Sequence, residues 1–328
     1  MATYKEIHGI KVQYRDSDAT AIEGDVWYNA TTGLLKMYAA LGSWATSNDF
    51  NRPNGATDAE LSGTQTAGLL AGGFNPTDGD FGLTETYNGT SWTEVADLNT
   101  ARYSVSSAGT QTATIAGAGK TDSPDAQIAA AELWDGASWT EVADLSTARH
   151  DAAAAGTSTA ALAIAGKTPS NVAVVESWNG TAWTEIADIN TARWGLGSAG
   201  TSTAAQIVGG HPGRAICEQW NGTSWTEVAD LNAGRYGSQG GGTTSAAFVA
   251  AGQTAASSPN GTALMEEWDN TSWTEIADLN VVRHSVAGCG TATSGLLAGG
   301  NGSPTPSGIS LATEEWTVAA DKQTVAFD

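Results

Sequence analysis

Cysteine and basic residues are scarce in this chain, and each shortage excludes a class of protein. The two cysteines, Cys217 and Cys289, lie far apart in the sequence, which excludes a disulfide framework, a Cys-x-x-Cys redox pair and a zinc knuckle. We expect both to be small buried thiols. Only 14 Lys and Arg residues stand against 35 Asp and Glu residues, for a formal net charge of −21. Because no basic run can neutralise phosphates, we expect neither a nucleic-acid partner nor an anionic-membrane partner.

Long apolar runs are missing as well. No stretch has the apolar length of a membrane span, so we expect no membrane insertion. The first residues include Lys5, Glu6 and His8 where a secretory leader would need an apolar segment. Conventional secretion by a leader of its own is therefore not expected.

Catalytic and metal-binding signatures are also absent. There is no Walker loop, no Gly-x-Ser-x-Gly and no His-Glu-x-x-His. A copper site would need convergent donors, but the only histidines are His8, His150, His211 and His284. A glycosidase would need two acids at a fixed separation, and the sequence singles out no such pair. Weak calcium candidates lack the rest of an EF-type loop; they are Asp16 with Asp18, Asp78 with Asp80, and Asp122 with Asp125. We predict a non-enzymatic protein with no catalytic residues, no cofactor and no metal.

What the chain does contain is one repeated phrase, Trp-Thr-Glu-(Val/Ile)-Ala-Asp-(Leu/Ile)-Asn/Ser, followed by an Arg. The spacing from Trp to Arg is constant, while the distances between successive Trp residues are 47, 44, 42 and 48. The five copies run from Trp92 to Arg102, Trp139 to Arg149, Trp183 to Arg193, Trp225 to Arg235 and Trp273 to Arg283. A segment that keeps its length while its surroundings vary indicates a packed unit with loops attached.

Two further markers recur six times and predict the fold of the unit. An apolar run ends in a Gly or Gly pair, first at Gly72-Gly73, and a Glu-x-aromatic triplet follows, first at Glu85 and Tyr87. Asn-Gly or Asp-Gly dipeptides such as Asn88-Gly89 join that triplet to the next Trp, as the positive φ angles of a type I′ hairpin turn require. Four short strands per unit, six units and no helical periodicity predict an all-β, six-bladed β-propeller.

At this point the repeats resemble Kelch repeats. Gly72-Gly73, Glu85, Tyr87, Asn88, Trp92 and Arg102 match the Kelch pattern, and later units match in register over about residues 44–328. The second Gly is replaced in three units, by Ala118, Lys167 and Gln253, so those turns are expected to follow a different backbone path.

The ends of the ring must meet, because an open propeller would leave a bare strand edge. The last unit has Glu314 and Trp316 but no Trp-Thr-Glu phrase after them, whereas Trp44 to Asn51 mirrors that phrase, with Arg52 two places early. We therefore predict that residues 42–328 form the propeller, closed by the strand around Trp44 beside the strand around Trp316. The alternative is that residues 322–327 supply the closing strand.

Residues 1–41 lie outside the repeats, and residues 24–38 read as a β-hairpin with a turn at Asn29 to Gly33. This segment is similar to one found in tail-fibre and other virion proteins of bacteriophages, and the repeated phrase resembles Kelch-like arrays of marine phages. The resemblance implies a virion structural protein in several copies per particle, anchored to other virion proteins through residues 1–41. A tail-fibre or tail-tip position is preferred, and head decoration is the alternative.

The repeated charges and the variable loops are expected to have different roles. We interpret the repeated Arg and Glu as structural ion pairs within or between blades, because a side chain present in every blade cannot mark one site. Binding belongs in the variable loops, which cover residues 74–81, 120–127, 168–171, 211–214, 254–260 and 301–310. The candidate binding residues are Phe74, Asn75, Asp78, Asp80, Phe81, Asp122, Asp125, His211, Arg214 and Asn301.

Those loops predict a host-surface receptor or a glycan as the partner. A free glycan-binding or glycan-processing propeller is the alternative function, and few aromatic residues in the loops beyond Phe74 and Phe81 support it. An intracellular Kelch adaptor is a third, but residues 1–41 are too short for a recruiting domain.

Overall fold

The computed structural model describes residues 13–15, 26–31, 33–52, 56–254, 261–302 and 308–325. All regular structure in these residues is β-strand, as the sequence predicts. Within them there is no helix of the length and apolarity needed to cross a membrane. The chain divides into two compact units, one of residues 1–43 with 317–328 and one of residues 44–316.

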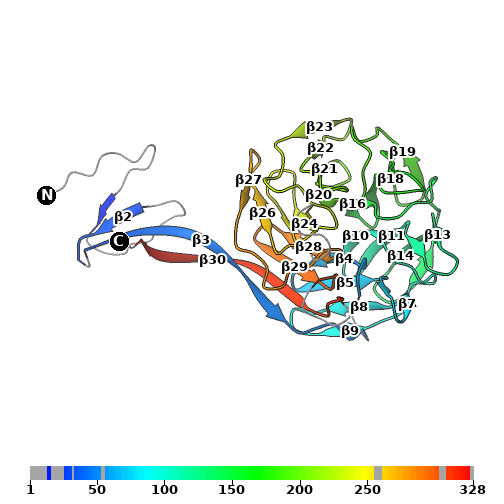
Figure 1. Ribbon diagram of the computed structural model, residues 1–328, viewed down its shortest axis with the longest axis horizontal. Helices are drawn as coiled ribbons and strands as arrows, with labels where there is room; N and C mark the ends of the chain where they lie inside the picture. Colours follow the sequence, from blue (N-terminus) through cyan, green and yellow to red (C-terminus); the bar gives the residue numbers. More distant parts are fainter. Residues whose placement is uncertain are drawn as a thin grey trace. The chain divides into compact units, whose positions relative to one another are not determined.

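Residues 44–316 hold six blades around a common centre (Figure 1). Blade 1 contains β4 (Glu60–Thr64), β5 (Ala67–Ala71), β8 (Thr84–Tyr87) and β9 (Trp92–Glu94), and blade 2 contains β10 (Ser106–Thr110), β11 (Ala113–Gly117), β14 (Ala131–Trp134) and β15 (Trp139–Glu141). Blade 3 contains β16 (Ala153–Thr157), β17 (Ala160–Ile164), β18 (Val175–Trp178) and β19 (Trp183–Glu185). Blade 4 contains β20 (Gly197–Thr201), β21 (Ala204–Val208), β22 (Cys217–Trp220) and β23 (Trp225–Val228). Blade 5 contains β24 (Gln239–Gly242), β25 (Ala247–Ala250), β26 (Met265–Trp268) and β27 (Trp273–Glu275).

The sixth blade combines the two ends of the ring. Its sheet order is β28 (Ala287–Thr291), β29 (Ser294–Ala298), β30 (Thr313–Val325) and β3 (Leu34–Ser47). The Trp44 and Trp316 rings lie 5.6 Å apart, close to the 4.9 to 5.5 Å of the matching aromatic pairs in the other blades. Residues 322–325 continue β30 and do not form a separate strand.

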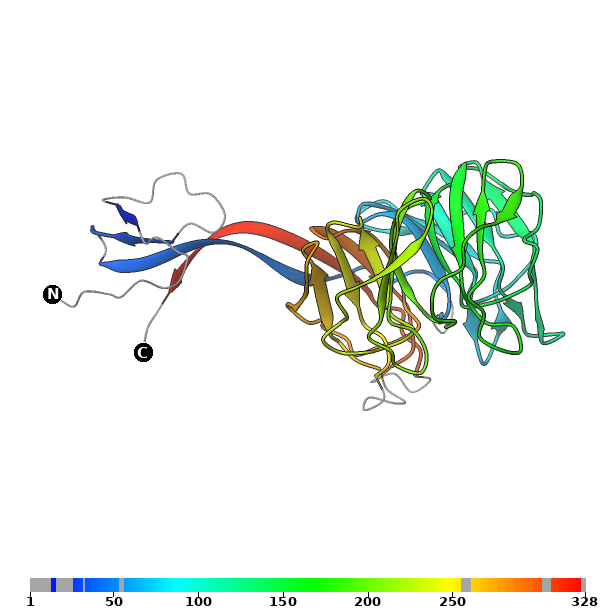
Figure 2. The ribbon, with the colours of Figure 1, turned by 90° about the horizontal axis from the view of Figure 1, so that it is seen from above.

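All strand pairs inside the blades with a defined register are antiparallel. Figure 2 shows the ring from the side, with the strands running between its two faces. The innermost strands are rich in Ala, Ser and Gly, which suits the crowded centre. The apolar core lies between blades: Leu69 and Ala71 of blade 1 pack against Val105, Trp134 and Trp139 of blade 2. Both cysteines are free and buried, as expected.

The outer hairpin turns differ from the predicted type I′ turn. In blade 1 the strands pair at Tyr87 and Trp92, which leaves a four-residue loop. The Oδ1 atom of Asn88 accepts the N–H groups of Thr90 and Ser91 at 3.0 and 2.9 Å, and only Gly89 has a positive φ, 87°. The first residue of each dipeptide, Asn or Asp, therefore caps the turn with its side chain, as an Asx turn, and the second residue takes the positive φ.

The described part of the other unit contains β1 (Gln13–Arg15), β2 (Val26–Asn29), the first part of β3 and the last part of β30. β1 is parallel to β2, and β2 is antiparallel to β3. The expected turn between Asn29 and Gly33 closes with a hydrogen bond from the Gly33 N–H to the Asn29 carbonyl at 2.8 Å.

Candidate functional site

Every blade contains one buried ion pair between a repeat Arg and a repeat Glu. We call these six pairs the Arg–Glu ring: Arg52–Glu85, Arg102–Glu132, Arg149–Glu176, Arg193–Glu218, Arg235–Glu266 and Arg283–Glu314. The nitrogen-to-oxygen distances run from 2.5 to 3.4 Å, and the side chains are at most 1 % exposed. Arg52 takes the place of the repeat Arg in blade 1, although it stands two positions early in the phrase.

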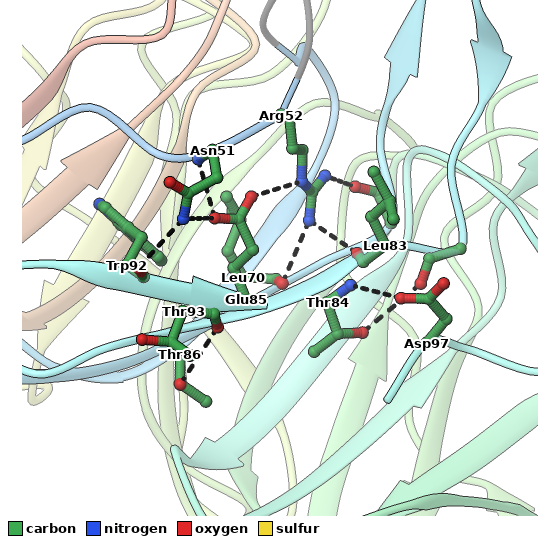
Figure 3. A network of polar contacts seen from close by, with 12 residues as sticks. Asn51, Arg52, Leu70, Leu83, Thr84, Glu85, Thr86, Trp92, Thr93 and Asp97 are labelled. Atoms are coloured by element: carbon green, nitrogen blue, oxygen red, sulfur yellow. Dashed lines mark hydrogen bonds and ion pairs between the residues drawn. The ribbon is translucent and has the colours of Figure 1, made fainter. Parts of the chain in front are cut away.

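Arg52 shows how these charges are compensated (Figure 3). Its guanidinium donates to the carbonyl oxygens of Leu70 and Leu83 at 3.2 and 2.7 Å, besides its contact with Glu85. Burial lowers the pKa of Arg52 to about 10, and the nearby Glu85 carboxylate opposes that shift. A buried charge needs such hydrogen bonds because its hydration is lost.

The second carboxylate oxygen of each repeat Glu ties two blades together. Glu85 Oε2 accepts the backbone N–H and the side-chain amide of Asn51, at 2.9 and 3.0 Å, and the same amide reaches the carbonyl of Trp92 at 3.0 Å (Figure 3). Asn51 follows the outer strand of blade 6, whereas Glu85 and Trp92 belong to blade 1. The Arg of the phrase, the Glu of the Glu-x-aromatic triplet and the Asn or Ser that follows the phrase's Leu or Ile thus serve the scaffold.

A second ring, of backbone hydrogen bonds, surrounds the axis. One residue per blade donates its N–H to the carbonyl of the matching residue in the preceding blade, with distances of 2.7 to 3.2 Å. This axial ring consists of Asp58, Ser104, Asp151, Gly195, Gly237 and Ser285. All six have a positive φ between 50° and 67°, a conformation that costs energy for the non-glycine members. The same conformation recurs in all six blades, where the hydrogen bonds of the axial ring accompany it.

A small cavity of about 50 Å³ lies at the axial ring. Its lining includes Asp58, Glu60, Asp151 and Gln239. Burial, reinforced by the Asp151 charge, raises the pKa of Asp58 to about 6. Burial also raises the pKa of Glu60 well above its usual value, although the Gln239 amide donates to it at 3.1 Å. The cavity therefore has acidic walls, and room for a few water molecules.

Outside the axial ring, side chains meet in pairs on one side of the propeller. The residue before each axial-ring member forms backbone hydrogen bonds with the residue that follows two positive-φ residues of its own blade. We call these two residues the Gly pair; they are Gly72 and Gly73 in blade 1, and Ala118–Gly119, Ala165–Gly166 and Ala251–Gly252 in three other blades. The first Gly and not the second is therefore replaced, and because these Ala residues keep a φ of 57° to 60°, the expected different backbone path was wrong. The side-chain pairs are Thr57 with Phe74, Tyr103 with Lys120, His150 with Lys167, Trp194 with His211, Tyr236 with Gln253, and His284 with Asn301. We call the side that carries these pairs the loop face. All the predicted variable loops begin there, because each follows a Gly pair.

Blades 4 and 5 bring three aromatic rings together on the loop face, next to a lysine of blade 3. Trp194 and His211 stack at 4.5 Å with an angle of 14° between their planes. Tyr236 meets both rings edge-on, at 5.5 and 5.0 Å, and the Lys167 ammonium lies 5.1 Å from the centre of the Trp194 ring. We call Trp194, His211, Tyr236 and Lys167 the aromatic patch. All four side chains are partly exposed.

Two positive neighbours affect His211. Its pKa is lowered by burial first and then by the charges of Lys167 and Arg214. The Nε atom of Arg214 is buried and donates no hydrogen bond.

The loops of blades 1 and 2 form a separate group. The small hairpins β6 (Phe74–Asn75) with β7 (Gly79–Asp80) and β12 (Lys120–Thr121) with β13 (Ala126–Gln127) lie here. Phe74 contacts the Tyr103 ring at 5.0 Å, Lys120 pairs with Asp125 at 2.6 Å, and the Asp122 N–H donates to Asp80 Oδ2 at 3.4 Å.

Of the other predicted binding residues, two support the loop instead of facing solvent. Asn75 is buried, and its Oδ1 accepts the Thr77 N–H at 2.8 Å. Phe81 is buried in the core between blades 6 and 1. Asp78 is exposed at the tip of its hairpin, and Asn301 pairs with His284 through the backbone.

Acidic residues of the calcium candidates do not gather with other metal-ligand side chains. Among the residues described, there is no group of three or more His, Cys, Asp or Glu arranged to hold a metal ion. Asp16 and Asp18 lie outside the described residues, as do residues 255–260 and 303–307 of two variable loops.

The residues that sequence reasoning missed are the partners of His211. Trp194 and Tyr236 occupy the position after the repeat Arg, where the sequence varies between Tyr, His and Trp, and that variation was the available signal. That variation points to the loop face only once the structure is known, because the strand register then places the residue after the repeat Arg beside the residue after the Gly pair. No protein-family model matches the chain, and no curated protein matches it in sequence.

Proposed function

We propose that this chain is a non-enzymatic recognition protein whose propeller binds a target through the loop face. One observation carries the proposal: the polar residues that recur in the blades are used in the Arg–Glu ring and its Asn contacts, whereas the loop face carries a different pair of side chains in each blade. A rigid repeat scaffold with one varied face is typical of proteins that bind partners.

The proposal extends to a place on a bacteriophage particle. Two resemblances support this extension. The repeated phrase and residues 24–38 resemble phage virion proteins, and the blades resemble Kelch repeats. Residues 1–41 would attach the chain to other virion proteins, in a tail fibre or tail tip, and several copies would turn weak contacts into avidity. Head decoration is the alternative position.

Mass spectrometry of density-purified particles from the source culture tests the virion assignment. We expect the chain to be enriched with capsid or tail proteins relative to the soluble lysate. A chain found in the lysate but not in particles would contradict this assignment and favour a free glycan-binding propeller, for which the aromatic patch is the supporting observation.

Binding of the labelled full-length chain to host cells tests the loop face. Replacing residues 168–171 and 211–214 by short Gly-Ser turns should weaken binding. The matched control changes the Asx turns on the opposite side of the blades, such as Thr181→Ser and Thr223→Ser. Equal binding by the loop variant and the control would show that the loop face does not recognise the target.

A further inference from the structure

The basic residues of the propeller fall into two groups. Residues 44–316 contain nine, and six of them are the arginines of the Arg–Glu ring. The other three, Lys120, Lys167 and Arg214, follow Gly pairs on the loop face. Lys120 is neutralised by Asp125 at 2.6 Å. Lys167 and Arg214 form no ion pair with any described carboxylate, although the chain has 35 acidic residues.

These two unpaired cations flank His211. Lys167 lies 5.1 Å from the centre of the Trp194 ring, which stacks on His211 at 4.5 Å. The Arg214 backbone N–H donates to the carbonyl of Gly210, the residue directly before His211, at 2.8 Å. Both cations lower the pKa of His211 by their positive charge. Like charges brought together on one surface repel one another, and a bound anion would relieve that repulsion. The buried Nε of Arg214 is also an unused donor.

The aromatic rings beside the cations indicate what carries the anion. Trp194 and Tyr236 are partly exposed, and flat rings of this kind offer apolar contact together with a polar edge, which suits a sugar ring. Gly195 and Gly237, directly after them, have no side chain that would fill the neighbouring space.

Charge elsewhere on the loop face limits the size of the ligand. Asp58 and Asp151 stand at the axis, and Asp78, Asp80 and Asp122 lie in the loops of blades 1 and 2. A long polyanion crossing this face would meet those carboxylates. A single acidic substituent on a saccharide would not.

We propose that Lys167, Arg214 and His211 bind the anionic substituent of an acidic saccharide, with Trp194 and Tyr236 against its sugar ring. The inference rests on the proposed function and names the ligand class of the loop face. The shared chemistry is an oxyanion, whether carboxylate, sulfate or phosphate, which accepts hydrogen bonds from a lysine, an arginine and the N–H of an imidazole.

Calorimetric titration of the full-length chain tests this proposal. The probes are trigalacturonate, a sulfated chondroitin tetrasaccharide and glucose 6-phosphate, each beside a neutral counterpart, and inorganic phosphate as a free anion. At least one acidic saccharide should bind more tightly than its neutral counterpart and than phosphate. Lys167→Ala and Arg214→Ala should each weaken that binding about tenfold or more.

Lys120→Ala is the matched control, because it removes a cation of the loop face that already has a partner; its affinity should stay at the wild-type value. In NMR titrations, with the His211 signal assigned through His211→Asn, bound saccharide should raise the pKa of His211. A structural role of Lys167 alone would not produce that rise.

Three results would overturn the proposal. They are no binding by any acidic saccharide, equal affinity in the Lys167→Ala and Lys120→Ala variants, and phosphate binding as tight as the saccharides. If the chain still attaches to host cells through the loop face in these cases, the proposed function stands and only the ligand class is wrong.

Discussion

At Asp58, the backbone hydrogen bonds of the axial ring hold a carboxyl group in a position that is unfavourable for its charge. The Asp58 backbone completes the axial ring, so its side chain is held at the axis near Asp151. Burial and the Asp151 charge raise its pKa from 3.8 to about 6, while hydrogen bonds from Ser285 and Thr57 and the charge of His150 act in the opposite direction. The ionised carboxylate is thus less stable in the folded chain than in the unfolded chain.

This unfavourable position predicts a pH-dependent effect of Asp58→Asn. Below about pH 4 the acid is protonated in both states and contributes nothing. Between about pH 4 and 6 the folded chain keeps a proton that the unfolded chain loses, so the parent becomes less stable as the pH rises. The variant avoids this cost, so its gain in free energy of unfolding should grow through that window and stay level above it.

Urea unfolding at several pH values measures the effect. Glu185→Gln removes one exposed acid and so controls for the change in net charge. A gain for Asp58→Asn that is the same at pH 4 and pH 7.5 would show that the folded-state pKa of Asp58 is not raised.

At five of the six junctions between blades, an Asn side chain donates hydrogen bonds from one blade to the next. Asn99 donates to Glu132 Oε2 at 2.7 Å and to the Trp139 carbonyl at 3.1 Å, and so joins blades 1 and 2. The same contacts recur at the other blade junctions except one. Between blades 2 and 3 the residue is Ser146, which reaches Glu176 only through its backbone N–H, at 2.7 Å.

Ser146→Asn should therefore strengthen the junction between blades 2 and 3. Ser146 is exposed, as Asn99 is, so the longer side chain has room, and its two new hydrogen bonds should raise the free energy of unfolding by about 1 kcal/mol. The reciprocal change, Asn190→Ser, removes the contacts to Glu218 and Trp225 and should lower it by a similar amount. Urea unfolding compares the two; changes of the same sign would refute the role given to the Asn.

The blades were predictable because each marker has one structural cause. The Trp and the Glu-x-aromatic triplet recur at fixed spacing since they face each other across one hairpin, as Trp134 and Trp139 do. The turn type was mispredicted because Asn and Asp favour both left-handed backbone and side-chain capping, and the dipeptide alone does not distinguish them. The aromatic patch was not predictable, since Trp194 and His211 meet only through the backbone pairing of two segments.

For the molecule as a whole, the sixth blade shows how the two ends of the repeat array meet. Asn280 donates to the carbonyl of Trp44 at 3.1 Å, the contact that Asn232 makes with Trp273 in the preceding blade at 2.7 Å. Trp44 thus occupies the place of a repeat Trp, although it lies before all the other copies in the sequence. Closure in this way gives the sixth blade its fourth strand, and the innermost strands of blades 6 and 1 lie in contact.

Deleting residues 40–52 tests what closure contributes. The deletion removes the outer strand of blade 6 together with Asn51 and Arg52, so Glu85 would be buried without its cation and Trp316 without its ring partner. Because breaking one buried ion pair alone costs about 3–5 kcal/mol, cooperative folding should be lost. Deleting residues 1–33 is the control, since it leaves Trp44 and its strand in place and should preserve the thermal transition. Thermal unfolding is monitored by tryptophan fluorescence and circular dichroism. If the variant without residues 40–52 unfolds at the same temperature as the parent, the ring is stable without this strand.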